Sequence, residues 1–267
     1  MDFASPRDLD GALAAKAAAP DAVFLAGGTD LMVGVNLAHY RPVSVIGLRH
    51  VEEIQGIGAD RIGAGVTWAR LERDSRRALA QLARTVGSPQ IRAAGTIGGN
   101  VGTASPAGDG LPWIAALDAS IAVVSRTRGE RTVPWNEFFV GVKRTSLAPD
   151  EMITAVVLSD EVPDVQEFAK VGVRNAMVIS TVSCVVMRID GAFRVALGSV
   201  APTPMRVYEA EAMLNAESSP SPKAIAEFGR LVSQEVRPIT DHRSTEAYRR
   251  HAAGVLAQRL VRRCLAA

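Results

Sequence analysis

Two glycine-rich segments carry most of the residues in this chain that could bind a ligand through hydrogen bonds. The first segment is residues 26–31, AGGTDL, and the second is residues 95–106, GTIGGNVGTASP. Paired glycines let a backbone come close to a ligand, and successive free N–H groups form a concave site for an anion. A single glycine pair is usually an ordinary tight turn. Two pairs, each followed by polar side chains, favour a site for the two phosphates of a dinucleotide.

The familiar dinucleotide fingerprints are missing, although hydroxyl and amide groups accompany both glycine pairs. Thr29, Thr96 and Thr103 offer hydroxyl donors, and Asn100 can both donate and accept. A Rossmann fingerprint requires G-x-G-x-x-G, but GIG at 56–58 and GAG at 63–65 both lack the last glycine. No G-x-x-x-x-G-K motif of a phosphate-binding loop occurs. A different dinucleotide-binding fold is therefore indicated.

Several other kinds of chemistry are excluded. The only cysteines, Cys184 and Cys264, cannot supply an iron–sulfur cluster or a zinc site, and the four histidines lack metal-ligand spacing. We expect no metal site, and no nucleophile–base pair marks a catalytic residue. The net charge of +2 argues against nucleic acid as a partner. No signal-peptide pattern and no long apolar run occur, so a cytoplasmic protein without a membrane segment is expected.

The elements that must position these segments alternate between strands and helices in the first part of the chain. The chain has 267 residues, enough for one large or two modest domains, and 48% of them are hydrophobic. Residues 9–19 and the apolar stripe at 79–86 predict helices. Strands are expected over these segments: 23–26, 43–48, 61–67, 121–124 and 152–158. Residues 128–129 are expected to turn a hairpin between 120–126 and 130–133.

The last third of the chain has a different order of elements. Residues 167–173 and 181–189 are predicted strands, and Asp190-Gly191 is a hairpin signal before a strand over 193–200. Only helices are expected after residue 204, one of them capped by Ser221 with a proline at its first position. This order predicts an α+β fold. We place a domain boundary near residues 160–165, giving domains 1–162 and 163–267.

The two glycine segments resemble a known family. Together with ASPAGD at 104–109, they are similar to the FAD-binding medium subunits of the molybdenum hydroxylases, which include xanthine and carbon monoxide dehydrogenases. The resemblance covers nearly the whole chain. It extends through these further segments: SPQIR at 88–92, FFVG at 138–141, LAPDE at 147–151, GSVAPTPMR at 198–206 and STEAYRR at 244–250.

The resemblance implies a two-subdomain FAD-binding module of the vanillyl-alcohol-oxidase (PCMH) type, followed by a small α+β domain with an antiparallel sheet and helices. The subdomains would span about 1–53 and 54–162. FAD would lie extended between them as the cofactor. The site residues carried over by the resemblance are Leu25, Ala26, Gly27, Gly28, Thr29, Asp30, Leu31, Thr96, Gly98, Gly99, Asn100, Thr103, Asp109, Leu147 and Lys170.

Four of these residues have an ordinary structural alternative. By similarity, Leu147 would pack on the isoalloxazine, and Lys170 would lie near the flavin, where a cation favours the reduced ring. Leu147 could equally be core, and Lys170 a surface side chain. Asp30 could bond its own loop, and Asp109 could belong to a turn.

The resemblance implies an electron-transfer subunit of an oxidoreductase. A large partner would oxidise the substrate at a molybdenum cofactor, a small partner with [2Fe–2S] clusters would relay electrons, and FAD would pass them to an external acceptor. A dimer of such heterotrimers is expected. Two alternatives remain: a free-standing NAD(P)H-dependent flavin reductase of the same fold, and an assembly subunit with a decayed FAD site. Residues 171–177 lack the acidic residues that some NAD-reducing members carry there.

Overall fold

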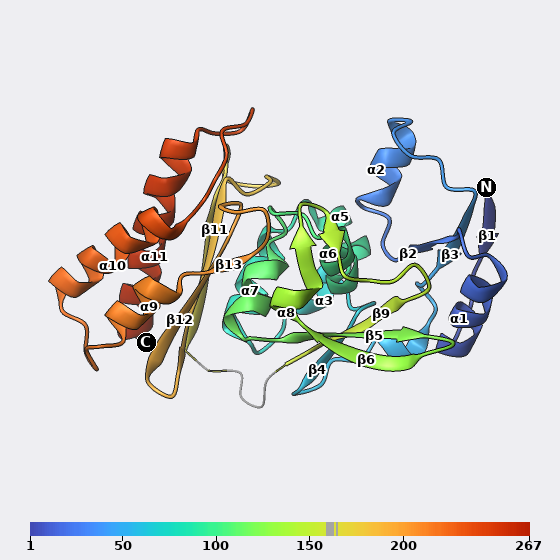
Figure 1. Cartoon of the computed structure of the whole chain (residues 1–267), viewed down its shortest axis with the longest axis horizontal. Helices are drawn as coiled ribbons and strands as arrows, with labels where there is room; N and C mark the ends of the chain where they lie inside the picture. Colours follow the sequence, from blue (N-terminus) through green and yellow to red (C-terminus); the bar gives the residue numbers. More distant parts are fainter. Residues whose placement is uncertain (159–162, 164) are drawn as a thin grey trace.

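The computed structural model describes residues 1–158, 163 and 165–267. Figure 1 shows three groups of elements side by side, with the N-terminal sheet at one end and the C-terminal helices at the other. Between them lies a central group that contains the second glycine segment. The arrangement mixes helices with sheets that are partly parallel and partly antiparallel, as the predicted α+β class requires.

The N-terminal group is a small parallel sheet with strand order β1-β3-β2. Helix α1 covers it and is capped by Asp8, whose carboxylate accepts from the amide of Gly11 at 2.7 Å. Strand β2 leads directly into the first glycine segment, which ends in the short helix α2. No residue of α2 is buried, and the helix projects from the molecule (Figure 1). The bounds are β1 (Asp2–Ala4), α1 (Leu9–Ala18), β2 (Val23–Leu25), α2 (Leu31–Asn36) and β3 (Ser44–Gly47).

The central group is built on an antiparallel sheet with strand order β4-β9-β5-β6. The predicted hairpin forms, with Gly129 at φ 71°. The strand expected over 61–67 ends at Gly63, because the amide of Val66 turns back to donate to the carbonyl of Gly63. The bounds are β4 (Arg61–Gly63), β5 (Ser120–Ser125), β6 (Gly129–Pro134) and β9 (Met152–Val157).

Short helices surround the central sheet and supply most of the side chains that pack against it. The predicted stripe lies on α4, where Leu79, Leu82 and Ala83 are fully buried. A small hairpin, β7–β8, projects beside the glycine segments. The bounds are η1 (Glu52–Ile54), α3 (Trp68–Leu71), α4 (Arg77–Thr85), α5 (Pro89–Ala94), α6 (Ile97–Thr103), α7 (Gly110–Ala116), α8 (Trp135–Phe138), β7 (Phe139–Gly141) and β8 (Arg144–Thr145).

The C-terminal group is a four-stranded sheet, β10-β11-β12-β13, with three helices on one face. The prediction of helices only after residue 204 is wrong for β13, which pairs with β12 before the helices begin. Asp190 and Gly191 both have positive φ, 51° and 81°, as the predicted two-residue hairpin requires. Ser221 caps α10 through the amide of Ala224. The bounds are β10 (Gln166–Val171), β11 (Val182–Ile189), β12 (Ala192–Gly198), β13 (Met205–Arg206), α9 (Tyr208–Leu214), α10 (Pro222–Glu235) and α11 (Glu246–Leu265).

The C-terminal sheet is buried on both faces because its side chains alternate between two cores. On β11, Val185 and Met187 join the core of the central group, whereas Cys184 and Val186 join the core under the helices. The two groups are therefore packed together through this sheet. The predicted division between residues 162 and 163 lies at residues that fall partly outside the described ones, and it stays a prediction.

Candidate functional site

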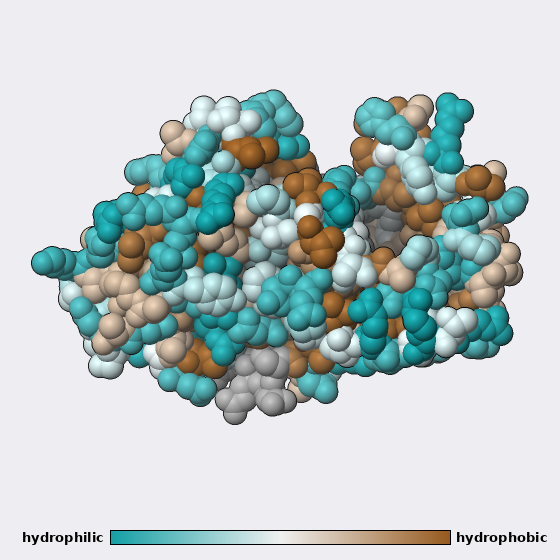
Figure 2. All heavy atoms as spheres, viewed as in Figure 1, coloured by the Kyte–Doolittle hydropathy of each residue, from teal (hydrophilic) through white to brown (hydrophobic). Residues whose placement is uncertain are grey.

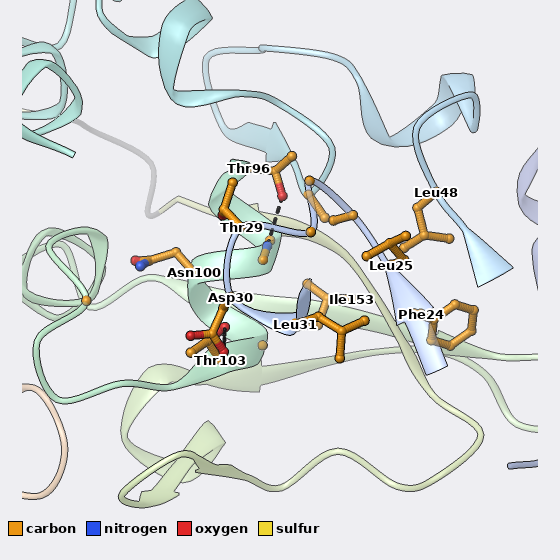
Figure 3. A pocket seen from close by; sticks show the side chains of 18 of the residues that line it. Phe24, Leu25, Thr29, Asp30, Leu31, Leu48, Thr96, Asn100, Thr103 and Ile153 are labelled. Carbon is orange, nitrogen blue, oxygen red and sulfur yellow. Dashed lines mark hydrogen bonds between the residues drawn. The ribbon is translucent and has the colours of Figure 1, made fainter. Parts of the chain in front are cut away.

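A cavity of about 610 Å³ lies between the N-terminal and central groups. It falls within the range of small-molecule sites, roughly 300–1,000 Å³. Both glycine segments line it, together with β2 and the start of α2. Figure 2 shows the surface hollowed between the projecting α2 region and the middle of the molecule. Figure 3 shows Thr29, Thr96 and Asn100 at one side of the cavity and Phe24, Leu25 and Leu48 at the other.

The first glycine segment presents free amide groups to this cavity. Within the described residues, the backbone N–H groups of residues 27–30 donate to no other group. Gly28 has φ 72°, which favours glycine. Gly27 is required for another reason, because a Cβ there would lie 1.8 Å from the carbonyl oxygen of Ala94. The segment is therefore a concave set of donors suited to an anion, as its sequence predicts.

The second glycine segment differs from the loop that its composition predicts. Residues 97–103 form helix α6, and Thr96 caps it by accepting from the amide of Gly99 at 2.9 Å. The amide of Gly98 donates to the carbonyl of Ala64, and that of Asn100 to Thr96. These amides are already used, so the expected second set of free donors is wrong. This side of the cavity offers side chains instead.

The side chains on α6 and the first segment retain unused hydrogen-bonding groups. Asn100 accepts from the amide of Gly110 through Oδ1 at 3.2 Å, which leaves its NH2 group available. Thr103 donates to Asp30 at 3.5 Å, and Lys143 lies 3.5 Å from the other oxygen of that carboxylate. Asp30 therefore bonds across the cavity mouth rather than to its own loop. Thr29 makes no hydrogen bond through its hydroxyl in the described chain.

The opposite side of the cavity is apolar. In Figure 3, Leu31 lies beside Ile153, and Leu25 lies beside Leu48. Leu147 also lines the cavity while packing against the central core. An ion pair fixes the segment that carries Leu147, because Glu151 accepts from Arg131 at 2.6 Å and from the amide of Ala148 at 2.8 Å. The bond from the Arg131 guanidinium lowers the pKa of Glu151 to about 2.

The structure brings together all but two of the predicted site residues. Those that line the cavity are Leu25, Ala26, Gly27, Gly28, Thr29, Asp30, Leu31, Thr96, Gly98, Gly99, Asn100, Thr103 and Leu147. The two others, Asp109 and Lys170, lie just outside it. The cavity ends at Gly108 and Ile179, which directly precede Asp109 and Ser180 in the chain.

Asp109 and Lys170 form a buried ion pair behind the cavity wall. Lys170 Nζ lies 2.6 Å from Asp109 Oδ2 and also donates to the carbonyls of Thr85 and Val178. Ser180 donates its hydroxyl to the other carboxylate oxygen. Burial raises the pKa of Asp109, and the neighbouring Lys170 opposes this shift. Lys170 is thus not the surface side chain of the alternative interpretation, and it does not line this cavity.

Several lining residues carried no signal in the sequence. They come from distant elements and are apolar, so nothing distinguishes them from core until the fold is formed. They are Val23, Phe24, Leu48, Ile54, Ala64, Trp68, Val86, Ile91, Met152, Ile153 and Ile179. Within the described residues, no group of three or more His, Cys, Asp or Glu side chains could hold a metal ion. No helix of that part of the chain could cross a membrane.

Each half of the chain matches a known protein family. Residues 1–159 match the family described as "FAD binding domain in molybdopterin dehydrogenase". Residues 167–264 match "CO dehydrogenase flavoprotein C-terminal domain". The fold and the cavity therefore define a flavin-binding protein with an FAD-binding domain followed by a smaller antiparallel domain.

Individual relatives agree with this assignment. The chain is 30% identical to a xanthine dehydrogenase FAD-binding subunit of Escherichia coli, over 93% of this chain and 90% of the relative. It is 35% identical to a nicotinate dehydrogenase FAD-subunit of Eubacterium barkeri, over 68% and 66%. A carbon monoxide dehydrogenase from Hydrogenophaga pseudoflava superposes with a TM-score of 0.90 at 27% identity, covering 100% of this chain and 97% of that one. The chain belongs to the FAD-binding medium subunits of the molybdenum hydroxylase family, and it is an oxidoreductase subunit whose cofactor is FAD.

Proposed function

We propose that the cavity between the N-terminal and central groups holds FAD. The observation that carries this proposal is the set of free amides at residues 27–30, which faces an apolar surface across one cavity. Such a cavity fits a molecule with a charged pyrophosphate and a flat ring system. The free amides would bind the pyrophosphate together with Thr96 and Asn100, and Leu147 would pack on the ring. When bound, FAD can accept electrons singly and release them in pairs.

We propose further that this chain passes electrons rather than oxidising a substrate itself. The electrons would come from the [2Fe–2S] clusters of a small partner subunit and leave to an external acceptor. Substrate oxidation would occur on a large subunit that carries the molybdenum cofactor. Relatives are FAD subunits of xanthine and nicotinate dehydrogenases, which supports this division of tasks. Glycines and neutral polar groups dominate the part of the cavity lined by the two glycine segments, as expected for a site that binds a cofactor.

A free-standing NAD(P)H-dependent flavin reductase is not favoured. Such an enzyme would need an acidic group free to act near the flavin. The described lining of the cavity contains two carboxylates, Asp30 and Glu151. Both are paired with cations, Lys143 and Arg131 respectively.

The electron-transfer proposal can be tested on the complex that forms around this chain in its native host. Purification through a tag on this chain should yield FAD together with iron and molybdenum. Removing FAD should leave reduction of the iron–sulfur absorbance by substrate intact but abolish reduction of an added dye acceptor. Adding FAD back should restore it. An FAD-free complex that reduces the dye at the original rate would contradict the proposal, and NADH oxidation by this chain alone would favour the reductase.

We also propose a cytoplasmic dimer of heterotrimers. Both cysteines are free and buried, which suits a reducing compartment. The mass of the purified complex, measured by light scattering, tests the stoichiometry, and fractionation of native cells tests the compartment.

A further inference from the structure

A second cavity, of about 820 Å³, lies between the central group and the C-terminal sheet. Helix α4, the start of α5, strand β10 and the loop at 172–178 form its walls. Apolar residues contribute to its lining, among them Pro89, Ala176 and Met177. Its size is in the upper part of the range for small-molecule sites, roughly 300–1,000 Å³, and exceeds what a single inorganic ion would fill.

The charged side chains that line this second cavity are all cations. They are Arg84, Arg92, Lys170 and Arg174. Arg92 is neutralised by Glu72, and Lys170 by Asp109. The other two, Arg84 and Arg174, form no ion pair with any described residue; they donate to the backbone carbonyls of Glu72, Ala176 and Met177. The cavity therefore carries two uncompensated positive charges.

Neutral groups complete the lining in a way that suits an organic anion. Asn175 makes no hydrogen bond in the described chain, so its side-chain amide is available as a donor. The guanidinium of Arg174 bonds carbonyls of its own loop and so is held beside the cavity. Guanidinium groups form charge-assisted hydrogen bonds with phosphate, and the apolar residues Pro89, Ala176 and Met177 offer a surface for a ring.

This second cavity shares a wall with the FAD cavity. Val86, Ile91 and Ile179 line the first cavity. Their neighbours in the chain, Gly87, Arg92 and Val178, line the second cavity. Three pairs of consecutive residues thus form the partition between the cavities. A ligand in the second cavity would be separated from the first by one layer of residues.

We propose that the second cavity binds a phosphate-bearing organic molecule, separately from FAD, through Arg84 and Arg174. Phosphate oxygens would accept hydrogen bonds from these two arginines, and the organic part would lie against Pro89, Ala176 and Met177. The lining residues named here all come from this chain, and the proposal is independent of whether the FAD cavity transfers electrons. Because the site adjoins the partition, a ligand bound there would change the surroundings of a flavin bound in the first cavity.

The test uses the full chain saturated with FAD, so that the first cavity is filled. Binding of 1-naphthyl phosphate is measured by isothermal titration calorimetry, with uncharged 1-naphthol and inorganic phosphate as comparisons. We expect one site per chain for 1-naphthyl phosphate and at least about tenfold weaker binding of each comparison compound. Arg84→Gln and Arg174→Gln should each weaken binding by about tenfold, as expected for loss of a charge-assisted hydrogen bond.

Two control variants separate charge from folding. Arg84→Lys keeps the charge and should retain part of the affinity. Arg259→Gln removes an exposed arginine of α11 that does not line the cavity, and it should bind like the original chain. Thermal unfolding of each variant checks that the fold is retained.

Three results would overturn the proposal. The first is no binding, or binding that neither Arg84→Gln nor Arg174→Gln weakens. The second is equal affinity for inorganic phosphate, which would mean that the apolar lining has no role. The third is release of FAD in proportion to the probe bound, measured as free flavin in the filtrate after ultrafiltration. This result would place the probe in the first cavity. If the chain takes up no FAD, the proposed FAD site fails, whereas the same titration on the unloaded chain still tests the second cavity.

Discussion

Two glycines of the FAD cavity are required for different physical reasons. A Cβ on Gly27 would lie 1.8 Å from the carbonyl oxygen of Ala94, so any side chain there would push the two glycine segments apart. A Cβ on Gly99 would meet only Thr96 Oγ1 at 3.2 Å and Ala26 Cβ at 3.9 Å. Space beside Gly99 is therefore open toward the cavity rather than filled by protein.

This difference predicts that Gly99→Val reduces FAD binding while the protein stays folded. The valine methyl groups would occupy space next to the free amides of residues 27–30, where the pyrophosphate is proposed to lie. Overpacking of this kind costs about 1–3 kcal/mol, so the Kd for FAD should rise by about tenfold or more. Flavin absorbance after gel filtration measures the loss. Gly56→Val is a matched control, because a Cβ there meets nothing within 4 Å.

The buried pair behind the cavity wall predicts a stability effect. Lys170→Met leaves the Asp109 carboxylate buried with only the Ser180 hydroxyl as a side-chain partner. Removing one member of a buried ion pair costs about 3–5 kcal/mol, measured here by urea unfolding near pH 7. Burial already raises the pKa of Asp109, and loss of the cation removes what opposes that shift. Because the protonated form is then favoured in the folded state, the deficit should shrink as the pH falls.

The double variant Lys170→Met with Asp109→Asn distinguishes the charge from the shape of the site. It should recover part of the lost stability, because no uncompensated charge remains buried. A double variant less stable than Lys170→Met alone would show that the carboxylate itself, and not its missing partner, holds this region together.

At the scale of elements, ion pairs join the segment between β8 and β9 to the β5–β6 hairpin: Glu151 with Arg131 at 2.6 Å and with Arg128 at 3.5 Å, and Asp150 with Arg128 at 2.6 Å. Glu151 is 5% exposed and bonds both Arg131 on β6 and the amide of Ala148. Arg131→Met should therefore destabilise the chain and loosen Leu147 at the cavity. The bond from Arg131 lowers the pKa of Glu151 to about 2 from its ordinary value of 4.5.

The sign of this shift sets the pH window of the Arg131→Met effect. A lowered carboxyl pKa contributes stability that is present above about pH 4.5 and is lost as the pH falls toward about 2. The difference in unfolding free energy between the original chain and Arg131→Met should be constant from pH 7 to about 5 and shrink below that. A difference that grows on acidification would contradict the assignment.

Sequence patterns predicted most elements but not all of their ends. The hairpin at Asp190-Gly191 and the cap at Ser221 follow from local turn and capping chemistry, and both are confirmed. Glycine disfavours helices, and no local pattern in the second glycine segment predicts one. It forms α6 because Thr96 caps it, and because Gly98 fits where a Cβ would lie 2.5 Å from Ala64 Cβ. That close approach is tertiary and leaves no local pattern.

The residues of the candidate site could also be predicted only in part from the sequence. Its glycine and polar residues stand in two short segments and could be recognised as motifs, whereas its apolar wall is assembled from many elements. The resemblance implies that Lys170 lies near the flavin, which stays a prediction; the structure shows that Lys170 pairs with Asp109 behind the cavity wall. Whether two charges face a ligand or each other depends on distances that sequence spacing does not encode.

At the scale of the whole molecule, the C-terminal sheet joins the two predicted domains rather than merely following the first. Phe168 and Met187 belong to the core of the central group. Gln166 accepts from the Trp113 indole at 3.2 Å, and Glu167 pairs with Arg77 at 2.6 Å. The partition between the two cavities also takes Val178 and Ile179 from the C-terminal side.

These contacts predict that neither half is stable alone. A chain cut between residues 162 and 163 would leave the indole of Trp113 and the face of α4 without their partners. The apolar area exposed would be unfavourable by about 25 cal/mol per Å². Residues 1–162 expressed alone should therefore aggregate and retain little FAD, whereas co-expression with residues 163–267 should give a 1:1 complex that binds FAD. Gel filtration and flavin absorbance measure both outcomes. A soluble, FAD-loaded 1–162 fragment would instead show that the central core closes without the C-terminal sheet and that the buried Asp109–Lys170 pair is dispensable for the cavity.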